Sequence, residues 1–257
     1  MKTALLVGTI KPHSKNLKST VYSDENYFVP EYRLKQYLGG IYYYLTQSNF
    51  DNIIFCENSN YKIDCLEDIE RTAKLFNKKF ELIQFNADIE KIEKYSYHYG
   101  EAELLDYAFD NSILLKESTD FYKITGRYII YNINELIEFC ETSENYFYKG
   151  FGLNSTLGVN TAFFKCSNEF YSKNIYGKQT DFYKKSNKLN FIPLEKVYYL
   201  ILKKILFKNH QKLKIIPIYQ FFKTKDILIE HIKLKSGFIE YKNIGKLLDI
   251  VITPFKN

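Results

Sequence analysis

The chain has 257 residues, of which 46% are hydrophobic and 26% charged. This balance allows a buried core and excludes a disordered protein. Its formal net charge of +6 suits anionic partners such as nucleotides, phosphorylated lipids or an acidic membrane surface, without choosing among them. The four cysteines form no Cys-X-X-Cys pair and no run of about 20 apolar residues occurs, so we expect a cytoplasmic protein that is soluble or peripheral, with no zinc site.

The first half of the chain alternates between short apolar runs and helical patterns. Such an alternation predicts one α/β, Rossmann-like domain with a mostly parallel central sheet flanked by helices. Ligand sites in sheets of this kind gather at the carboxyl ends of the strands. The expected strands are Thr3–Ile10, Asn52–Cys56 and Phe80–Phe85, and the expected helices are Glu31–Gln47, Cys65–Asn77 and Gly100–Leu115.

The second half is less regular and shows neither a linker nor an internal repeat, which favours a single domain. A Gly-rich stretch covers residues 150–158, and a basic segment covers Ile232–Lys235. Strands are expected at Phe121–Tyr131, Val159–Lys165 and Leu213–Tyr219, and helices at Asn134–Cys140, Ser167–Asn174, Pro193–Phe207 and Lys242–Ile250.

The segment Phe121–Tyr131 contains two closely spaced cations. The period of two along a strand places Lys123, Thr125 and Arg127 on one face. Two neighbouring cations in an apolar sheet cost desolvation and repulsion unless an anion such as a diphosphate binds them. Gly126 allows a ligand or a neighbouring backbone to approach closely. A solvated edge strand remains the structural alternative.

The residues Lys123-Ile-Thr-Gly-Arg-Tyr128 resemble a K-[IL]-[TS]-G-R-Y/F motif of bacterial GT-A-like glycosyltransferases found among capsule and lipopolysaccharide genes. Tyr99-Gly100-Glu101 is similar to the loop and helix that precede the motif in that group. Downstream, Val159–Phe164 resembles its "v-[DN]-T-x-x-F" segment, and Leu194–Tyr198 resembles its acidic helix. The likeness covers most of the chain.

This resemblance implies that residues 1–131 form a nucleotide-sugar-binding half and residues 132–257 an acceptor-side half of the same domain. It also implies that the loops after the first two strands bind the donor, where Arg33 is a further phosphate candidate or a plain surface arginine. The implied donor-binding residues are Thr9, Pro12, Glu57, Asn58, Gly100, Lys123, Thr125, Gly126, Arg127 and Thr161.

Two departures from the group bear on the chemistry. His98 stands near where the loop of the group usually carries a lysine. No Asp-X-Asp ends a predicted strand, because Asp64 and Asp68, like Asp106 and Asp110, have helical spacing. We therefore expect no metal and no cofactor, with Lys123 and Arg127 neutralising the leaving diphosphate.

An inverting transfer needs a carboxylate that accepts the proton of the acceptor hydroxyl. Glu195, the only acid in a largely apolar segment, is the first candidate, although a glutamate after Pro193 also suits a helix N-terminus. Glu101 comes second, together with Glu103, and Glu101 could instead orient a sugar hydroxyl. The pair Glu230 and His231 is a third option, with His231 more typical of a structural residue.

The expected partners are a nucleotide-sugar donor and a glycan or lipid-linked acceptor, with peripheral contact at the inner membrane and no nucleic acid. Lys233, Lys235 and Lys246 could close over the diphosphate or form a solvated basic face. Two other classes stay open. A nucleotidyltransferase would carry a Gly-rich loop after the first strand, which residues 8–12 do not supply. A non-catalytic glycan- or nucleotide-binding module is the other alternative.

Overall fold

The centre of the fold is a mixed sheet whose first four strands run parallel. The computed structural model describes residues 1–12, 28–141, 144–151, 157–185, 192–206, 214–217 and 229–231. Strand β1 (Thr3–Gly8) lies between β2 (Asn52–Glu57) and β4 (Asp120–Thr125), and β3 (Lys79–Gln84) follows β2 at the edge. Every residue of β1 and β2 is buried, as their unbroken apolar runs predict.

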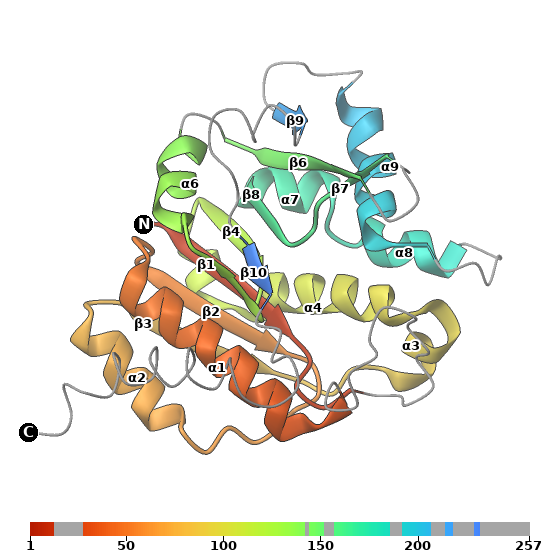
Figure 1. The fold of residues 1–257 in the computed structure, drawn as a ribbon. Helices are drawn as coiled ribbons and strands as arrows, with labels where there is room; N and C mark the ends of the chain where they lie inside the picture. Colours follow the sequence, from red (N-terminus) through yellow and green to blue (C-terminus); the bar gives the residue numbers. More distant parts are fainter. Residues whose placement is uncertain are drawn as a thin grey trace, which may run out of the picture.

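The second half of the chain extends the same sheet. Strand β8 (Phe163–Ser167) pairs antiparallel with β4, and β6 (Tyr146–Phe151), β7 (Leu157–Val159) and β9 (Lys214–Pro217) continue beyond it. The strand order is β3-β2-β1-β4-β8-β6-β7, with β9 beside β6. The antiparallel pairing brings the start of β8 to the carboxyl end of β4, so residues from both halves meet at one edge of the sheet (Figure 1).

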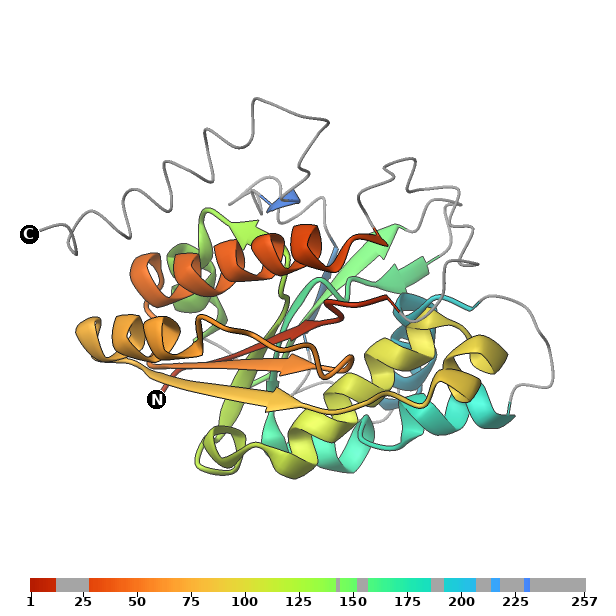
Figure 2. The same cartoon turned by 90° about the horizontal axis from the view of Figure 1, so that it is seen from below.

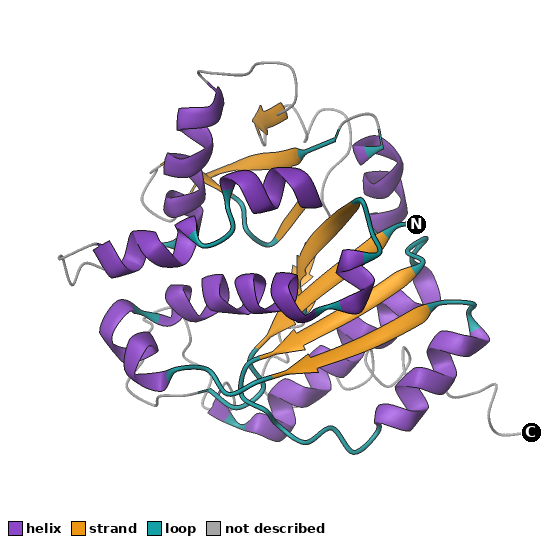
Figure 3. Cartoon of the chain, turned by 180° about the vertical axis from the view of Figure 1, so that it is seen from behind, coloured by secondary structure: helices purple, strands orange, loops and turns teal. Residues whose placement is uncertain are grey.

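Helices cover both faces of the sheet and bury two apolar layers. Figure 2 shows α1 (Pro30–Gln47), α2 (Leu66–Leu75) and α6 (Ile133–Cys140) on one face. Their side chains pack with those of β1 and β2 into one core cluster. Figure 3 shows the opposite face, where a second cluster forms. The helices there are α3 (Ile89–Tyr95), α4 (Tyr97–Asn111), α5 (Ile113–Lys116), α7 (Asn168–Asn174), α8 (Lys178–Lys185) and α9 (Leu194–Leu206).

The helix expected over Gly100–Leu115 is divided in two. Helix α4 ends at Asn111, and Ser112 begins α5 by accepting the Leu115 N–H with its hydroxyl. The Glu81 carboxylate accepts hydrogen bonds from the Ser112 hydroxyl at 2.5 Å and from the Ile113 N–H at 2.8 Å. This cap starts a new helix where the apolar pattern alone predicts a continuous one.

Three other segments differ from expectation. Helices α3 and α8 are polar and short, and they were not expected. Strands β6 and β7 occupy parts of the segment expected as an irregular Gly-rich stretch. The basic segment at residues 232–235 and the helix expected at 242–250 lie outside the described residues.

The strand expected over Phe121–Tyr131 is also interrupted. Strand β4 ends at Thr125, and β5 (Tyr128–Ile130) leaves the central sheet to pair with β10 (Ile229–His231). A Cβ on Gly40 would lie 2.3 Å from the Gly126 carbonyl oxygen, so α1 packs directly against this turn. Lys123 and Thr125 therefore share a strand face, but Arg127 lies in the turn beyond it, which corrects the expectation of two cations on one strand.

Candidate active site

A buried ion pair lies near the carboxyl end of β4. The Lys123 side chain is fully buried, and its Nζ donates to Glu101 Oε1 at 2.6 Å. Nζ also donates to Thr125 Oγ1 at 3.2 Å and to the Thr161 carbonyl oxygen. An ammonium has three protons, so these three acceptors use them all. Lys123 therefore holds protein groups in place, whereas the sequence suggested a direct phosphate contact.

Thr161 links this ion pair to the first turn of α9. Its hydroxyl donates to Glu195 Oε1 at 3.2 Å, while its carbonyl accepts from Lys123. The second carboxylate oxygen of Glu195, Oε2, is buried and has no hydrogen-bond partner among the described residues. A buried carboxylate oxygen without a partner is costly and calls for an explanation. A substrate hydroxyl donating to it is one such explanation.

The surroundings of Glu195 favour its neutral form. Burial raises the pKa of the Glu195 carboxyl, and the negative charge of Glu101 raises it further. The Thr161 hydroxyl and the Lys123 ammonium act in the opposite direction. A carboxylate whose pKa is raised toward neutrality is a stronger base, which is the property that proton abstraction requires.

A second cluster joins the loops after β1, β2 and β3. Glu57, at the end of β2, is fully buried. Its Oε1 accepts from the N–H groups of Ile10 and Ser59, each at 2.9 Å, and from the Ser59 hydroxyl. Its Oε2 accepts from the Tyr61 N–H at 3.1 Å and from Gln84 Nε2 at 3.4 Å. The Glu57 carboxylate therefore joins the loops after β1 and β2 to the end of β3, and its oxygens are used for that rather than facing a nucleotide base.

Thr9 and Asn58 lie side by side in the loops after β1 and β2, next to Glu57. The Thr9 hydroxyl donates to Asn58 Oδ1 at 2.6 Å. Asn58 Nδ2 lies 3.7 Å from the position of a Cβ on Gly100, so the loop after β2 meets the first turn of α4. The Thr9 carbonyl accepts from Arg33 Nε at 2.8 Å and Nη2 at 2.5 Å, which gives Arg33 a structural role here.

The structure thus sorts the predicted site residues into two groups. Lys123, Thr125, Glu101, Thr161 and Glu195 form one connected set. Thr9, Glu57 and Asn58, at the ends of β1 and β2, form the other, together with Gly100 in the first turn of α4. Pro12 is half-buried after β1, Arg127 is buried, and Gly126 packs against Tyr37 and the Val7 carbonyl.

Three tyrosines also contribute to the two groups of site residues, and the sequence analysis did not identify them. The Tyr37 hydroxyl accepts the Thr9 N–H at 2.9 Å and fixes the loop after β1. Tyr183 of α8 donates to the Ile192 carbonyl at 3.0 Å, and its pKa is raised first by burial and then by Glu101 and Glu195. Tyr198 is fully buried, and its hydroxyl has no partner among the described residues. Its position three residues after Glu195 was the available signal, since such residues share a helix face.

The remaining candidate residues make none of the hydrogen bonds that connect these two groups within the described part of the chain. Asp106 is surrounded by donors from Tyr171, Gly177, Gln179 and Thr180, which join α4 to α7 and α8. Asp64 pairs with Lys62 at the surface. Burial raises the pKa of Glu103, and burial lowers the pKa of His98 to about 4. Glu230 and His231 lie in β10.

No protein-family model and no curated protein matches the sequence. Among solved structures, the glycosyltransferase GlyE of Streptococcus pneumoniae TIGR4 matches 98% of this chain with a TM-score of 0.56 and 11% identity, and its apo form matches equally. The chain spans 62% of the length of GlyE. An active-site mutant of LgtC matches 97% of this chain and 96% of its own, with a TM-score of 0.55 and 8% identity. These likenesses confirm the predicted α/β, GT-A-like fold.

Proposed function

We propose that this protein is a glycosyltransferase that moves a sugar from a nucleotide-sugar donor onto a surface glycan of the capsule or lipopolysaccharide type, working at the cytoplasmic face of a membrane. The class rests on the GT-A-like fold over nearly the whole chain. The observation that carries the chemistry is the buried Oε2 of Glu195, which lies near the Lys123–Glu101 ion pair and has no hydrogen-bond partner in the described part of the chain.

In this proposal, Glu195 is the general base. Its free oxygen accepts the proton of an acceptor hydroxyl while the hydroxyl oxygen bonds to the anomeric carbon. The bond from that carbon to the nucleoside diphosphate breaks, and the diphosphate leaves with its electron pair. Thr161 holds the other carboxylate oxygen, so the free one keeps its direction. Lys123 and Glu101 are positioning residues that fix Thr161 and set the charge around the base.

The donor would bind at the ends of β1 and β2. Thr9, Pro12 and Asn58 border this edge, and Glu57 fixes their loops from below. Arg127, in the turn after β4, is the cation that we assign to the leaving diphosphate. We further propose that no divalent metal takes part, because Asp106 is already surrounded by donors and Asp64 pairs with a surface lysine. Turnover that EDTA abolishes and Mn²⁺ restores would contradict this.

The first test identifies the nucleotide. Thermal shift with UDP, GDP, CMP and dTDP sugars should stabilise the protein with one family of donors. Stabilisation by nucleoside triphosphates alone would instead indicate a nucleotidyltransferase. No stabilisation by any of them would indicate a non-catalytic module.

The second test uses the donor found in this way. The variant Glu195→Gln keeps the size and one hydrogen bond of the side chain but removes its basicity. We expect hydrolysis or transfer to fall by about 10² to 10⁴, with donor stabilisation retained. The control is Glu169→Gln, an exposed position on α7, which should behave as wild type. Equal activity of the two variants would remove Glu195 from the mechanism.

A further inference from the structure

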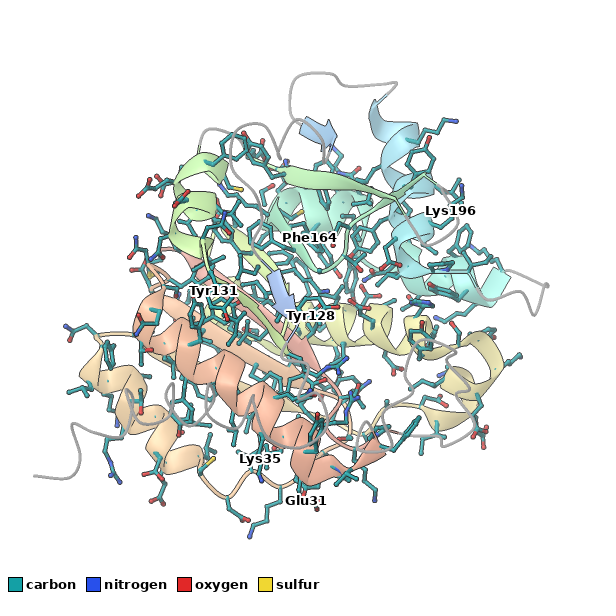
Figure 4. All side chains as sticks on the ribbon, viewed as in Figure 1. Glu31, Lys35, Tyr128, Tyr131, Phe164 and Lys196 are labelled. Carbon is teal, nitrogen blue, oxygen red and sulfur yellow. The ribbon has the colours of Figure 1, made fainter. Side chains whose placement is uncertain are left out.

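Helix α9 carries a basic and aromatic stripe on the side that faces away from the sheet. The stripe consists of Lys196, Tyr199 and Lys203, which share one helix face by their spacing of three and four residues. Lys196 Nζ lies 5.3 Å and Lys203 Nζ 6.0 Å from the centre of the Tyr199 ring. Figure 4 labels Lys196 on α9 at the margin of the molecule.

The opposite side of α9 is the more deeply packed one, and Tyr199 packs only partly against the same core cluster. Leu194, Val197, Tyr198 and Leu202 are fully buried and belong to the core cluster beneath the helix. Lys203 is exposed, and Lys196 and Tyr199 are half-buried. Within the described part of the chain, neither lysine forms an ion pair with an acid. The stripe therefore presents two uncompensated charges around one amphipathic ring.

The sequence from Lys196 onward is rich in lysine. Residues 196–225 contain eight lysines and neither aspartate nor glutamate. Lysines that approach an anionic bilayer surface each strengthen binding by about fivefold. A tyrosine among lysines on a helix is typical of segments that lie at the boundary between water and lipid, because its ring is apolar and its hydroxyl is polar.

We propose that the stripe on α9 binds the surface of an anionic lipid bilayer. A membrane fits better than single-stranded RNA, because bases stack on open aromatic faces and two ammonium groups lie against the Tyr199 ring. No helix among the described residues is both long and apolar enough to cross a membrane, so the contact is peripheral.

This contact would place the candidate active site close to lipid. Glu195 lies in the first turn of the same helix, and Lys203 is eight residues further on, which is about 12 Å along the axis. A lipid-linked acceptor anchored in the bilayer could then present its hydroxyl to Glu195. This consequence rests on the proposed function, whereas the membrane contact itself does not need the sugar transfer to be correct.

Vesicle flotation with the full chain tests the contact. The double variant Lys196→Gln/Lys203→Gln removes two charges from the stripe, and Lys74→Gln/Lys173→Gln removes two from exposed positions on α2 and α7. On phosphatidylglycerol vesicles, we expect the stripe variant to bind about 25-fold more weakly than wild type. The control variant should bind nearly as well as wild type. None of the three proteins should bind phosphatidylcholine vesicles.

Equal weakening by the two double variants would overturn the proposal, as would equal binding of wild type to both lipids. Tighter binding of wild type to single-stranded RNA, lost in the stripe variant, would assign the surface to nucleic acid instead. Thermal midpoints of both variants confirm folding. Thermal stabilisation by the donor, measured on the same samples, separates the two hypotheses. Absence of donor binding would count against the proposed sugar transfer, and absence of vesicle binding would count against the proposed membrane contact.

Discussion

The Lys123 ammonium lies 2.6 Å from the Glu101 carboxylate, between the central strand β4 and helix α4. The lysine side chain is fully buried, whereas the glutamate side chain retains 26% of its exposure. The two partners therefore differ in how well water can replace a lost contact. This asymmetry makes the ion pair sensitive to which side is removed.

Replacing Glu101 by Leu should destabilise the protein more than replacing Lys123 by Met. The first change leaves a fully buried ammonium without its acid, at about 3 to 5 kcal/mol, whereas the second leaves a carboxylate that water partly reaches. Urea unfolding at pH 7 measures both, and the double variant should recover part of the loss. Equal losses for the two single variants would show that solvent access does not decide the cost.

The pH dependence of turnover should report on Glu195. As the proposed base it would work only when deprotonated, and its raised pKa should move the acidic limb of the pH profile of kcat/KM above that of an ordinary glutamate. Burial, the largest cause, persists in Glu101→Gln, but the second cause disappears. The limb should therefore move to lower pH in Glu101→Gln, and stay in place in Glu169→Gln. A limb that does not move in Glu101→Gln would contradict the assignment.

His98 should make the fold sensitive to acid. Burial lowers its pKa from an ordinary 6.5 to about 4. Between pH 6.5 and 4 the unfolded chain therefore binds a proton at this residue and the folded chain does not. Stability is fully present above pH 6.5 and falls as the pH drops toward 4. Between pH 7 and 4.5 the loss should be about 2 to 3 kcal/mol. Chemical unfolding of wild type and His98→Gln at both values isolates this loss, which the variant should lack.

Gly40→Ala should disturb the turn that follows β4. The new Cβ would lie 2.3 Å from the Gly126 carbonyl oxygen, so α1 and the turn must separate. We expect a loss of about 2 to 3 kcal/mol in the free energy of unfolding, together with weaker donor binding. Gly177→Ala is the comparison, since its φ of +69° strains any side chain but nothing lies within 4 Å. It should cost only about 1 to 2 kcal/mol and leave donor binding intact.

The sequence was most informative where local pattern and tertiary environment agree. Apolar runs such as Thr3–Gly8 are buried on both faces, so their pattern alone identifies the parallel strands. The helix break at Ser112 depends on Glu81, 31 residues away, and the end of β4 depends on the close approach of Gly40 to Gly126. Contacts between residues so far apart leave no periodic signal.

The same contrast holds for the candidate site. Residue type and resemblance selected Glu101, Lys123, Thr161 and Glu195, and these four are connected by hydrogen bonds. Their roles could not be read in advance, because the ion pair that satisfies Lys123 depends on how α4 packs on β4. Glu57 was expected to contact a ligand, and only the structure reveals the backbone N–H groups that donate hydrogen bonds to its carboxylate.

The single carboxylate of Glu57 ties the loops after β1 and β2 together, and Gln84 adds the end of β3. Because it accepts hydrogen bonds from the N–H groups of Ile10, Ser59 and Tyr61, a change in either loop is transmitted to the other. Grafting only one of these loops from a protein of the same fold would leave this carboxylate with the wrong neighbours. The ends of β1 and β2 would have to be exchanged together, which makes this edge a module that can be inherited or engineered only as a whole.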